Sequence, residues 1–410
     1  MLASTACEPT QTDEQVNPVL ASSSLLAFCP NLCDSQYKDS LEIWSGEDYD
    51  TVRYLSMATL KDVAKLAEVS EATASLALNN GPVRESTRKR VLACARRLRY
   101  VPNRIGRILT TGRSNAVALL IMTSSKHADT VHKTSLFYYL VEGILSVLDR
   151  AGFTLRFDVK CHEDPNLRTY FEHMVGDRSL DGIIIVPQFV QDYHFINLLQ
   201  ERAFPYIMLR PAHYRNSVNY VDMGNLQGGK IVAALLKSLG CEKIALINGP
   251  DTHLDAIERE RGFTDGIASA GLSRFEKRYG DFTIPSGFQA MEKILSKFIP
   301  EAIFCANDYM AAGAIKYLHE RKIDVPRDIA VVGYDNNDIS VGLFPSLTTV
   351  DNRFEDLGEA LAKGLLALID GTRASVQCLV RPVLIKRQSH LWTPRKSVGR
   401  LMEKVNNRRN

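Results

Sequence analysis

The stretch Thr59–Asn80, TLKDVAKLAEVSEATASLALNN, constrains the fold more than any other part of the chain. Thr59 and Asp62 have the spacing of a capping box, so the pattern predicts a helix that begins at Leu60. The apolar residues on one face of this helix are Leu60, Val63, Ala64 and Ala67. After a short turn, Ser70 can cap a second helix over Glu71–Leu78. Two short helices joined by a tight turn favour a helix-turn-helix, which places its second helix in a DNA groove; a helical hairpin packed on another element is the alternative.

A third helix is predicted over Glu85–Arg99, because apolar residues again recur on one face while the arginines point outward. The residues expected on its inward face are Val91, Leu92, Ala95 and Leu98. Residues 57–113 carry twelve basic and four acidic side chains, a balance of +8, whereas residues 1–56 carry nine acidic and two basic ones, a balance of −7. A basic block that coincides with a helix-turn-helix pattern is the electrostatic footprint of a phosphate-binding module.

The acidic leader, residues 1–56, is polar and Ser-rich without sustained periodicity, and we expect it to be mostly disordered. Either translation really starts at Met57, or the leader competes with DNA phosphates for the basic helices. Its first residues lack the basic region of a signal peptide, and no apolar run of the chain reaches membrane-spanning length. The eight cysteines are scattered without metal-ligand spacing, so we expect no metal site, and reduced thiols as in a cytoplasmic protein.

From Ser114 onward, short apolar strands alternate with helical patterns, in a chain of 410 residues that has room for two or three domains. The predicted strands are Ala116–Ile121, Gly182–Val186, Tyr206–Leu209, Val218–Asp222, Lys243–Ile247, Ala302–Ala306 and Ile329–Val332, and one predicted helix is Phe137–Leu148. Such alternation indicates parallel sheets covered by helices on both faces. A core of about 275 residues exceeds one such sheet, so we expect two α/β lobes with a ligand crevice at the carboxyl ends of their strands.

Gly224–Lys230 has the GxxxxGK spacing of a phosphate-binding loop. The next residue is Ile231, where such a loop needs the hydroxyl of Ser or Thr to hold magnesium. The glycines are therefore better explained by a turn between a strand and a helix. The GxSxG, HExxH and GxGxxG motifs are absent from the sequence, so we expect no enzyme, no catalytic residue and no cofactor.

Polar residues that can hold a small ligand follow the ends of several predicted strands. Asn307 follows one strand, Asp335 follows another, and Arg259 lies on a helix beside Gly262-Phe263. A guanidinium and a carboxylate that face each other across a cleft suit the vicinal hydroxyls of a sugar, and aromatic side chains can pack against its ring. Each residue also has an ordinary structural explanation: Asp335 as a helix cap, Arg259 in a surface ion pair, and Tyr220 in the core.

The segments TLKDVAKLA, VS, the Thr73–Ser75 step, Leu78-Asn79 and YVPNR closely resemble the DNA-binding headpiece of the lac repressor family. By this resemblance, the residues expected to contact DNA phosphates are Leu60, Ser70, Thr73, Ser75, Asn79, Arg88, Tyr100 and Asn103. The residues expected to face the bases are Glu71, Ala72 and Leu76. RIGRILTT, residues 104–111, resembles the hinge helix that enters the minor groove, with Leu109 as its wedge and Gly106 in place of the usual Ala. Glu68 stands where relatives have Gly, so we expect a turn that is either strained or differently shaped.

The resemblance continues to about Ser389 and covers the family's two-lobed effector-binding core, which shares its fold with periplasmic sugar-binding proteins. It implies that the effector contacts Phe137, Tyr138, Arg210, Tyr220, Arg259, Phe282, Asn307, Asp335 and Asn352. Arg210 stands near a one-residue gap, and the Asp that many relatives have beside this position is missing. Two arginines in the crevice would also suit an acidic sugar or another small acid.

The resemblance implies a multidomain protein with an all-α helix-turn-helix headpiece over residues 57–103, a hinge helix and linker over residues 104–113, and a two-lobed α/β core with parallel sheets over residues 114–389. The acidic leader precedes the headpiece, and a basic tail, residues 390–410, follows the core. Such a protein would be a homodimeric, cytoplasmic, nucleoid-associated regulator, in most cases a repressor of carbohydrate genes. Its partners would be operator DNA and a small sugar-like effector. A solute-binding module without gene control, or a regulator that answers to a small acid or a purine, is the alternative.

Overall fold

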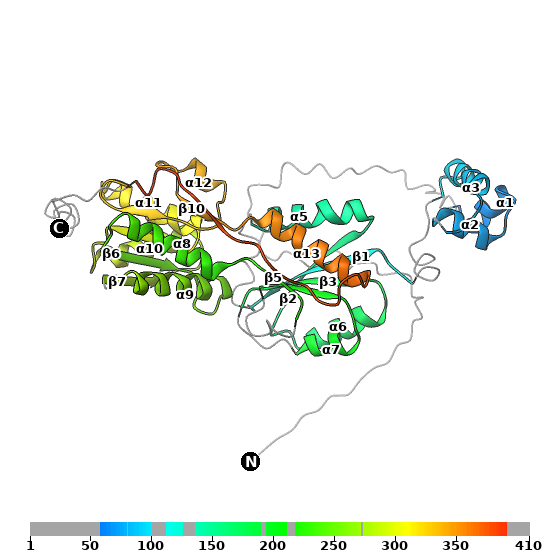
Figure 1. Ribbon diagram of the computed structural model, residues 1–410, viewed down its shortest axis with the longest axis horizontal. Helices are drawn as coiled ribbons and strands as arrows, with labels where there is room; N and C mark the ends of the chain where they lie inside the picture. The colour runs from blue at the N-terminus through cyan, green and yellow to red at the C-terminus, as the bar shows by residue number, and fades with distance from the viewer. Residues whose placement is uncertain are drawn as a thin grey trace, which may run out of the picture.

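The computed structural model describes residues 58–79, 81–100, 112–125, 136–189, 194–210, 218–271 and 274–391. It contains a small helical headpiece and a larger α/β core with two lobes (Figure 1). The predicted leader, the hinge residues Gly106 and Leu109, the headpiece residue Asn103 and the tail beyond Leu391 lie outside the described residues. Within the described part of the chain, no helix is long and apolar enough to cross a membrane.

The headpiece consists of three helices whose starts follow from local capping. They are α1 (Leu60–Leu66), α2 (Glu71–Leu78) and α3 (Glu85–Arg97). Thr59 and Asp62 form the capping box of α1, and the Ser70 hydroxyl accepts a hydrogen bond from the Thr73 amide, 3.1 Å away, at the start of α2. Glu68, in the turn between these helices, has a φ of 51°, a left-handed conformation that costs a non-glycine residue about 1–2 kcal/mol. The prediction of a strained turn is confirmed.

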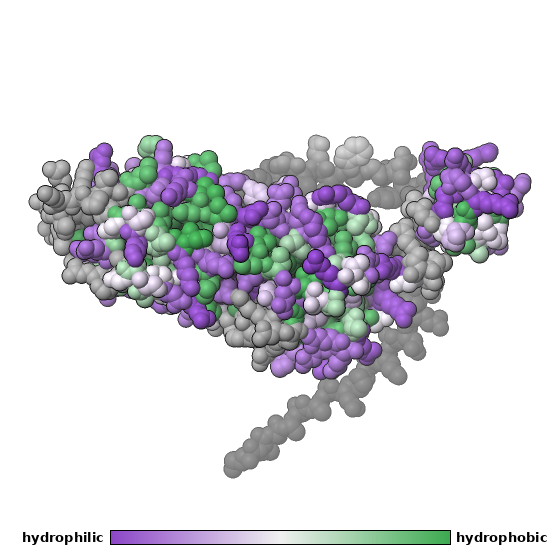
Figure 2. Space-filling view, viewed as in Figure 1, coloured by the Kyte–Doolittle hydropathy of each residue, from purple (hydrophilic) through white to green (hydrophobic). Residues whose placement is uncertain are grey.

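A small apolar core joins the three helices. Its buried residues are Val63, Ala64, Ala67, Ala74, Ala77, Val91 and Ala95. Leu98 packs against this core as expected, but the prediction for Leu92 is wrong, because its side chain is 39% exposed. Val91 and Ala95 lie one turn apart and face the core, so Leu92 lies about 100° around the helix and faces solvent. Figure 2 shows that hydrophilic residues dominate the visible face of the headpiece.

The first lobe is a six-stranded parallel sheet in the order β11-β5-β4-β3-β1-β2. Its strands are β1 (Ala116–Thr123), β2 (Thr154–Cys161), β3 (Gly182–Pro187), β4 (Tyr206–Leu209), β5 (Tyr220–Asp222) and β11 (Gln377–Leu379). Its helices are α5 (Leu136–Ala151), α6 (Leu167–Gly176), α7 (Phe195–Glu201) and α13 (Phe354–Ile369). α5 and α13 cover one face of the sheet and α6 and α7 cover the other (Figure 1), so successive residues of β1 such as Leu119 and Leu120 are buried on opposite sides.

The second lobe is a four-stranded parallel sheet in the order β7-β6-β8-β9. Its strands are β6 (Lys243–Asn248), β7 (Arg274–Tyr279), β8 (Ala302–Cys305) and β9 (Ala330–Val332). Its helices are α8 (Asn225–Ser238), α9 (Leu254–Ser269), α10 (Ile284–Leu295), α11 (Asp308–Glu320) and the short α12 (Ile339–Gly342). α8 and α9 cover one face and α10 and α11 the other. An antiparallel pair, β10 (Thr349–Asp351) and β12 (Val383–Ile385), lies beside this sheet.

The chain passes between the lobes three times, from β5 to α8, from β10 to α13 and from β11 to β12. The two predicted α/β lobes are therefore present, but neither is built from one continuous stretch. The core also extends past its predicted end, because His390 is buried with its Nδ1 atom 2.7 Å from the Thr348 hydroxyl. The Ser389 hydroxyl donates to the carbonyl of Val331, which fixes the same segment to β9.

The glycines of Gly224–Lys230 serve the packing of α8. Gly224 is the residue before the helix and has a φ of 69°, which glycine adopts without strain. A Cβ atom at Gly229 would lie 2.3 Å from the carbonyl oxygen of Arg259, so the missing side chain lets α8 and α9 approach closely. This arrangement supports the structural explanation of the glycines over nucleotide binding.

Candidate functional site

Helix α2 presents one face to solvent and the other to the headpiece core. Glu71, Ala72 and Leu76 lie on the exposed face, where Leu76 is 44% exposed although it is apolar. Ala74 and Ala77 fill the buried face. The exposed face of α2 is thus open to a groove of DNA, as a recognition helix must be.

Short polar side chains border this exposed face. The hydroxyls of Ser70 and Thr73 lie 2.8 Å apart, and the Asn79 amide nitrogen lies 3.4 Å from the Ser75 hydroxyl. Leu60 is the first residue of α1, where backbone amides at a helix start point outward. Hydroxyls, side-chain amides and helix N-termini are the groups that commonly bind DNA phosphates.

Arg88 and Tyr100 are engaged within the headpiece. The Arg88 guanidinium donates to the carbonyl oxygens of Ala77 at 3.0 Å and Gly81 at 2.6 Å, which stabilises the end of α2. Tyr100 packs partly buried against the apolar core. The structure therefore gives both residues a structural role, and their phosphate contacts stay a prediction.

A cavity lies between the two lobes of the core. The first lobe contributes Phe137, Leu140, Val186, Gln188, Leu209, Arg210, Met223 and Phe354 to its walls. The second lobe contributes His253, Asp255, Arg259, Phe282, Asn307 and Asp335. Largely apolar walls with a few convergent polar groups are typical of a small-molecule site.

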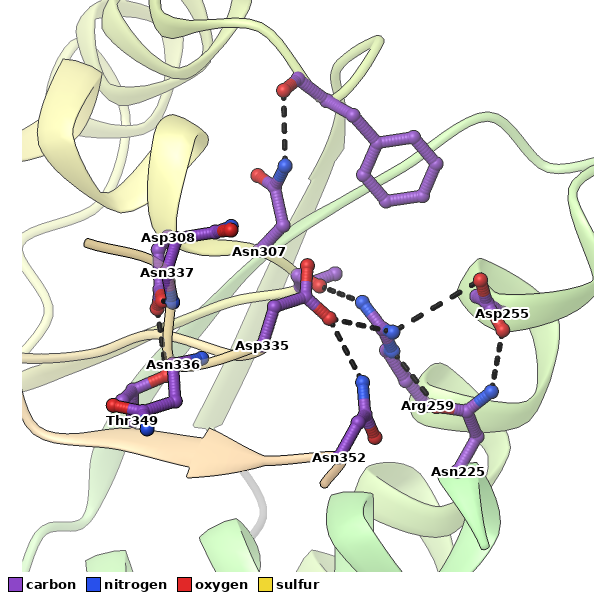
Figure 3. A network of polar contacts seen from close by, with 12 residues as sticks. Asn225, Asp255, Arg259, Asn307, Asp308, Asp335, Asn336, Asn337, Thr349 and Asn352 are labelled. Atoms are coloured by element: carbon purple, nitrogen blue, oxygen red, sulfur yellow. Dashed lines mark hydrogen bonds and ion pairs between the residues drawn. The ribbon is translucent and has the colours of Figure 1, made fainter. Parts of the chain in front are cut away.

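Arg259 is the centre of a polar network in the second-lobe wall (Figure 3). Its side chain is 2% exposed, and its Nη2 atom lies 2.8 Å from Oδ1 of Asp335. Its Nε donates to Asn225 at 3.0 Å and its Nη1 donates to the carbonyl of Ala306 at 2.5 Å. Its guanidinium carbon lies 3.9 Å from the centroid of the Tyr334 ring. Arg259 is therefore held rigidly by four neighbours and is no surface residue.

Asp335 is fixed by two partners at the same carboxylate oxygen. Besides Arg259, the amide nitrogen of Asn352 donates to Oδ1 of Asp335 at 2.9 Å. Burial raises the pKa of Asp335 above its usual value, while the charge of Arg259 acts in the opposite direction. Neither Asp335 as a helix cap nor Arg259 as a surface ion pair fits this geometry, so the ligand-site explanation gains weight for both. The expectation that the two face each other across the cleft is wrong, because both belong to the second lobe and bind each other.

Asn307 links the end of β8 to the cavity wall. Its Oδ1 accepts a hydrogen bond from the Met310 amide at 2.9 Å and caps α11, and its Nδ2 donates to the carbonyl of Phe282 at 2.9 Å. The ring of Phe282 packs edge-to-face against His253, with 4.9 Å between centroids. Asn307 and Phe282 therefore form one rigid part of the wall.

Arg210 lies at the end of β4 and is 3% exposed. It forms an ion pair with Asp255, which stands in the first turn of α9 on the other lobe. Its Nη2 also donates to the carbonyl of Pro187 at 3.2 Å. Arg210 has a φ of 49°, a strained conformation of the kind that often occurs at binding sites.

Comparisons with known proteins agree with this geometry. Residues 59–103 match the bacterial regulatory proteins of the lacI family, and residues 233–390 match a periplasmic binding protein-like domain. The chain is 31% identical over 339 residues to the HTH-type transcriptional repressor PurR of Klebsiella pneumoniae, which covers 81% of this chain and 97% of that relative. The chain belongs to the lacI family of bacterial regulatory proteins.

Other lacI-family proteins show similar agreement. The HTH-type transcriptional regulator CelR of Thermobifida fusca is 31% identical, over 81% of this chain and 98% of the relative. A crystal structure of the lac repressor dimer bound to operator and the anti-inducer ONPF is 28% identical with a TM-score of 0.71, over 82% of this chain and 99% of the other. The protein is therefore a DNA-binding transcriptional regulator with an effector-binding core, which confirms the predicted family, fold and general function. Its family is made up of DNA-binding regulators rather than enzymes.

Three residues that the lacI-family resemblance assigns to the effector do not line the described cavity, namely Tyr138, Tyr220 and Asn352. Tyr138 is 66% exposed, and its ring lies nearly perpendicular to that of Tyr139. Tyr220 packs partly buried against the core between the sheet and α6 and α7. The structure thus supports the core explanation of Tyr220. Asn352 is buried behind the wall, where it donates a hydrogen bond to Asp335.

Sequence reasoning missed several residues of the cavity wall. These residues include Gln188, His253, Asp255 and Phe354. A signal was present for Asp255, since it precedes Arg259 by four positions and both therefore fall on one face of α9. For Gln188 and Phe354, no local pattern separates a cavity residue from an ordinary strand end or helix start.

Proposed function

We propose that this lacI-family protein is a homodimeric repressor of a set of carbohydrate genes, which binds operator DNA through α2 and a small sugar-like effector between its lobes. The observation that carries the proposal is the combination, in one chain, of an exposed α2 face and an ion-paired cavity lined by both lobes. A solute-binding module needs only the cavity, and an enzyme needs reacting groups rather than a recognition helix. We therefore assign the protein no enzymatic role.

DNA recognition divides into positioning and base contact. Ser70 and Thr73, with Ser75, Asn79 and the amide of Leu60, bind phosphates and set the register on the duplex. Glu71 can accept a hydrogen bond from a cytosine amine, and the apolar side chains of Ala72 and Leu76 can contact thymine methyl groups. This combination predicts modest sequence specificity and a large contribution of phosphate contacts to the affinity for DNA. Operator affinity should therefore fall steeply as salt rises.

The effector site pairs a donor with an acceptor. Arg259 and Asp335 lie side by side in the cavity wall, which matches two adjacent hydroxyls of a sugar. Phe137, Phe282 and Phe354 provide apolar faces for its ring. A solved CelR–cellobiose complex is 28% identical with a TM-score of 0.60, and the ribose operon repressor of Escherichia coli is 30% identical, which supports a sugar as effector here.

Coupling between the effector site and the DNA-binding headpiece follows from the position of the cavity between the two lobes. Because the cavity is lined from both sides, a ligand that contacts both lobes changes the balance between open and closed cores. In a dimer, that change alters the spacing of the two headpieces on a pseudo-palindromic operator. Ligand and operator then change each other's affinity by the same factor. The similar structure of the lac repressor dimer bound to its operator supports this arrangement. We place the present protein on the bacterial chromosome in the cytoplasm.

Selection of DNA by the full chain from random-sequence duplexes tests the proposal. We expect enrichment of a two-fold pseudo-symmetric sequence, and an affinity for it that changes when a sugar found by thermal-shift screening is added. Leu76→Ala should change the enriched sequence. Leu92→Ala, which removes a similarly exposed leucine from α3, should not. Enrichment of no sequence above random would instead favour a solute-binding module.

A further inference from the structure

The ion pair between Arg210 and Asp255 joins the two lobes directly across the cavity. Arg210 comes from the end of β4 in the first lobe, and Asp255 comes from the first turn of α9 in the second. Both side chains line the cavity. An effector that enters this space therefore meets the two charges already paired with each other.

Asp255 is anchored as part of the folded structure. The amide nitrogen of the fully buried Asn225 donates to Oδ1 of Asp255 at 2.5 Å. The backbone amide of Asp255 donates to Nδ1 of His253 at 3.2 Å, within the cap of α9. A carboxylate in the first turn of a helix is also favoured by the helix dipole. These contacts fix Asp255 within the second lobe, in the position where it meets Arg210 of the first lobe.

The charges of the cavity wall are consequently balanced in pairs. Arg210 pairs with Asp255, and Arg259 pairs with Asp335 at 2.8 Å, while Nη2 of Arg259 also lies 3.9 Å from Asp255 (Figure 3). Among the described side chains, Gln188 has a buried Oε1 atom without a hydrogen-bond partner. The two contacts of Asp335 with Arg259 and Asn352 both use Oδ1. The acceptors Gln188 Oε1 and Asp335 Oδ2 therefore remain for a ligand, and they suit hydroxyl or N–H donors.

We propose that the Arg210–Asp255 pair determines ligand specificity by excluding anions, because Asp255 occupies the position in which a ligand carboxylate would otherwise bind Arg210. The cavity then selects neutral ligands rich in donors and rejects sugar acids of the same shape. The proposal rests on the proposed function only in taking this cavity as the effector site. Losing one partner of a buried pair is costly unless another charge replaces it. Removal of Asp255 should therefore turn a site that rejects anions into one that requires them.

The test uses acetate as a probe that does not depend on knowing the effector. Asp255→Ala in the full chain should bind acetate saturably, as a rise in melting temperature relative to chloride at equal ionic strength. The wild type and Asp265→Ala, which removes an exposed carboxylate from the same helix, should show no such rise. The double variant Arg210→Gln/Asp255→Ala should lose the response, which would assign the acetate site to Arg210.

A second comparison uses neutral and acidic sugars of equal shape, such as galactose and galacturonate. Asp255→Asn, which keeps the shape of the side chain, should raise the affinity for the acid relative to the neutral sugar by about tenfold or more over the wild type. The proposal would be overturned if acetate raised the melting temperature of the wild type as much as that of Asp255→Ala. It would also be overturned if acetate left the melting temperature of Asp255→Ala unchanged. If Asp255→Ala does not fold, the acetate titration is performed on Asp255→Asn with the same criteria. Operator selection is unaffected by these results, so failure here is distinct from failure of the regulator assignment.

Discussion

Replacing Arg259 by Met removes the cation from a polar network that is almost completely buried. Three groups lose their donor: Asn225 at 3.0 Å, the carbonyl of Ala306 at 2.5 Å and Asp335 at 2.8 Å. Asp335 would then remain buried as an unpaired carboxylate, and breaking a buried ion pair in this way costs about 3–5 kcal/mol. For lobes of this size, about 1 kcal/mol shifts the melting temperature by roughly 2–4 °C, so we expect a fall of roughly 10 °C.

The loss should depend on pH in a definite direction. Burial already raises the pKa of Asp335 from 3.8, and removal of Arg259 raises it further. The folded variant then binds the Asp335 proton more tightly than the unfolded chain does, so the proton stabilises the fold at low pH. This contribution is lost as pH rises through the raised pKa. The difference between wild type and Arg259→Met should therefore be smaller at pH 5 than at pH 8.

Thermal unfolding of the full chain, followed by far-ultraviolet circular dichroism between pH 5 and pH 8, measures both effects. Arg261→Met is the matched control, since Arg261 is exposed on the same helix and its loss should change the melting temperature little. A destabilisation by Arg259→Met below about 1 kcal/mol, or one that does not change with pH, would refute the role of Arg259 as the counter-ion of Asp335.

Three further predictions concern the headpiece and the helix packing. Ser70→Ala removes the cap of α2 and should cost the headpiece about 1 kcal/mol while weakening binding to all DNA sequences alike in mobility-shift assays. Glu68→Gly relieves the left-handed turn and should stabilise the headpiece by roughly 1 kcal/mol at most, measured by thermal unfolding. Gly229→Ala places a Cβ 2.3 Å from the Arg259 carbonyl and should lower the free energy of unfolding by about 1–3 kcal/mol. Gly176→Ala, in the first lobe with open space around it, should not lower the free energy of unfolding.

The sequence predicted those elements whose formation depends on local signals. The bounds of α2 follow from the Ser70 cap, and buried strands such as β4 are continuous apolar runs. The edge strands β2 and β7 escaped prediction because their sequences, TLRFDVKC and RFEKRY, mix charged and apolar residues. An edge strand has one neighbour and need not be apolar on both faces, so its pattern carries little signal.

The candidate site was predictable only in part. Arg259 and Asp335 were predicted from their residue types and from the lac repressor resemblance, and both do line the cavity. Their ion pair, and the one between Arg210 and Asp255, join residues far apart in the chain. Such pairs depend on how the lobes are assembled. Tyr138 is a residue for which the family resemblance predicted an effector contact that its 66% exposure does not support.

The threading of the chain through both lobes has a consequence for its synthesis. The first-lobe sheet has β11 as an edge strand and α13 as a covering helix, and both follow the whole second-lobe sheet in the sequence. The headpiece, in contrast, needs only its own three helices. During translation the headpiece can therefore fold long before the first lobe is complete. A nascent chain that stops after α12 would carry the DNA-contacting helix without a finished cavity, and so could occupy DNA without answering to an effector.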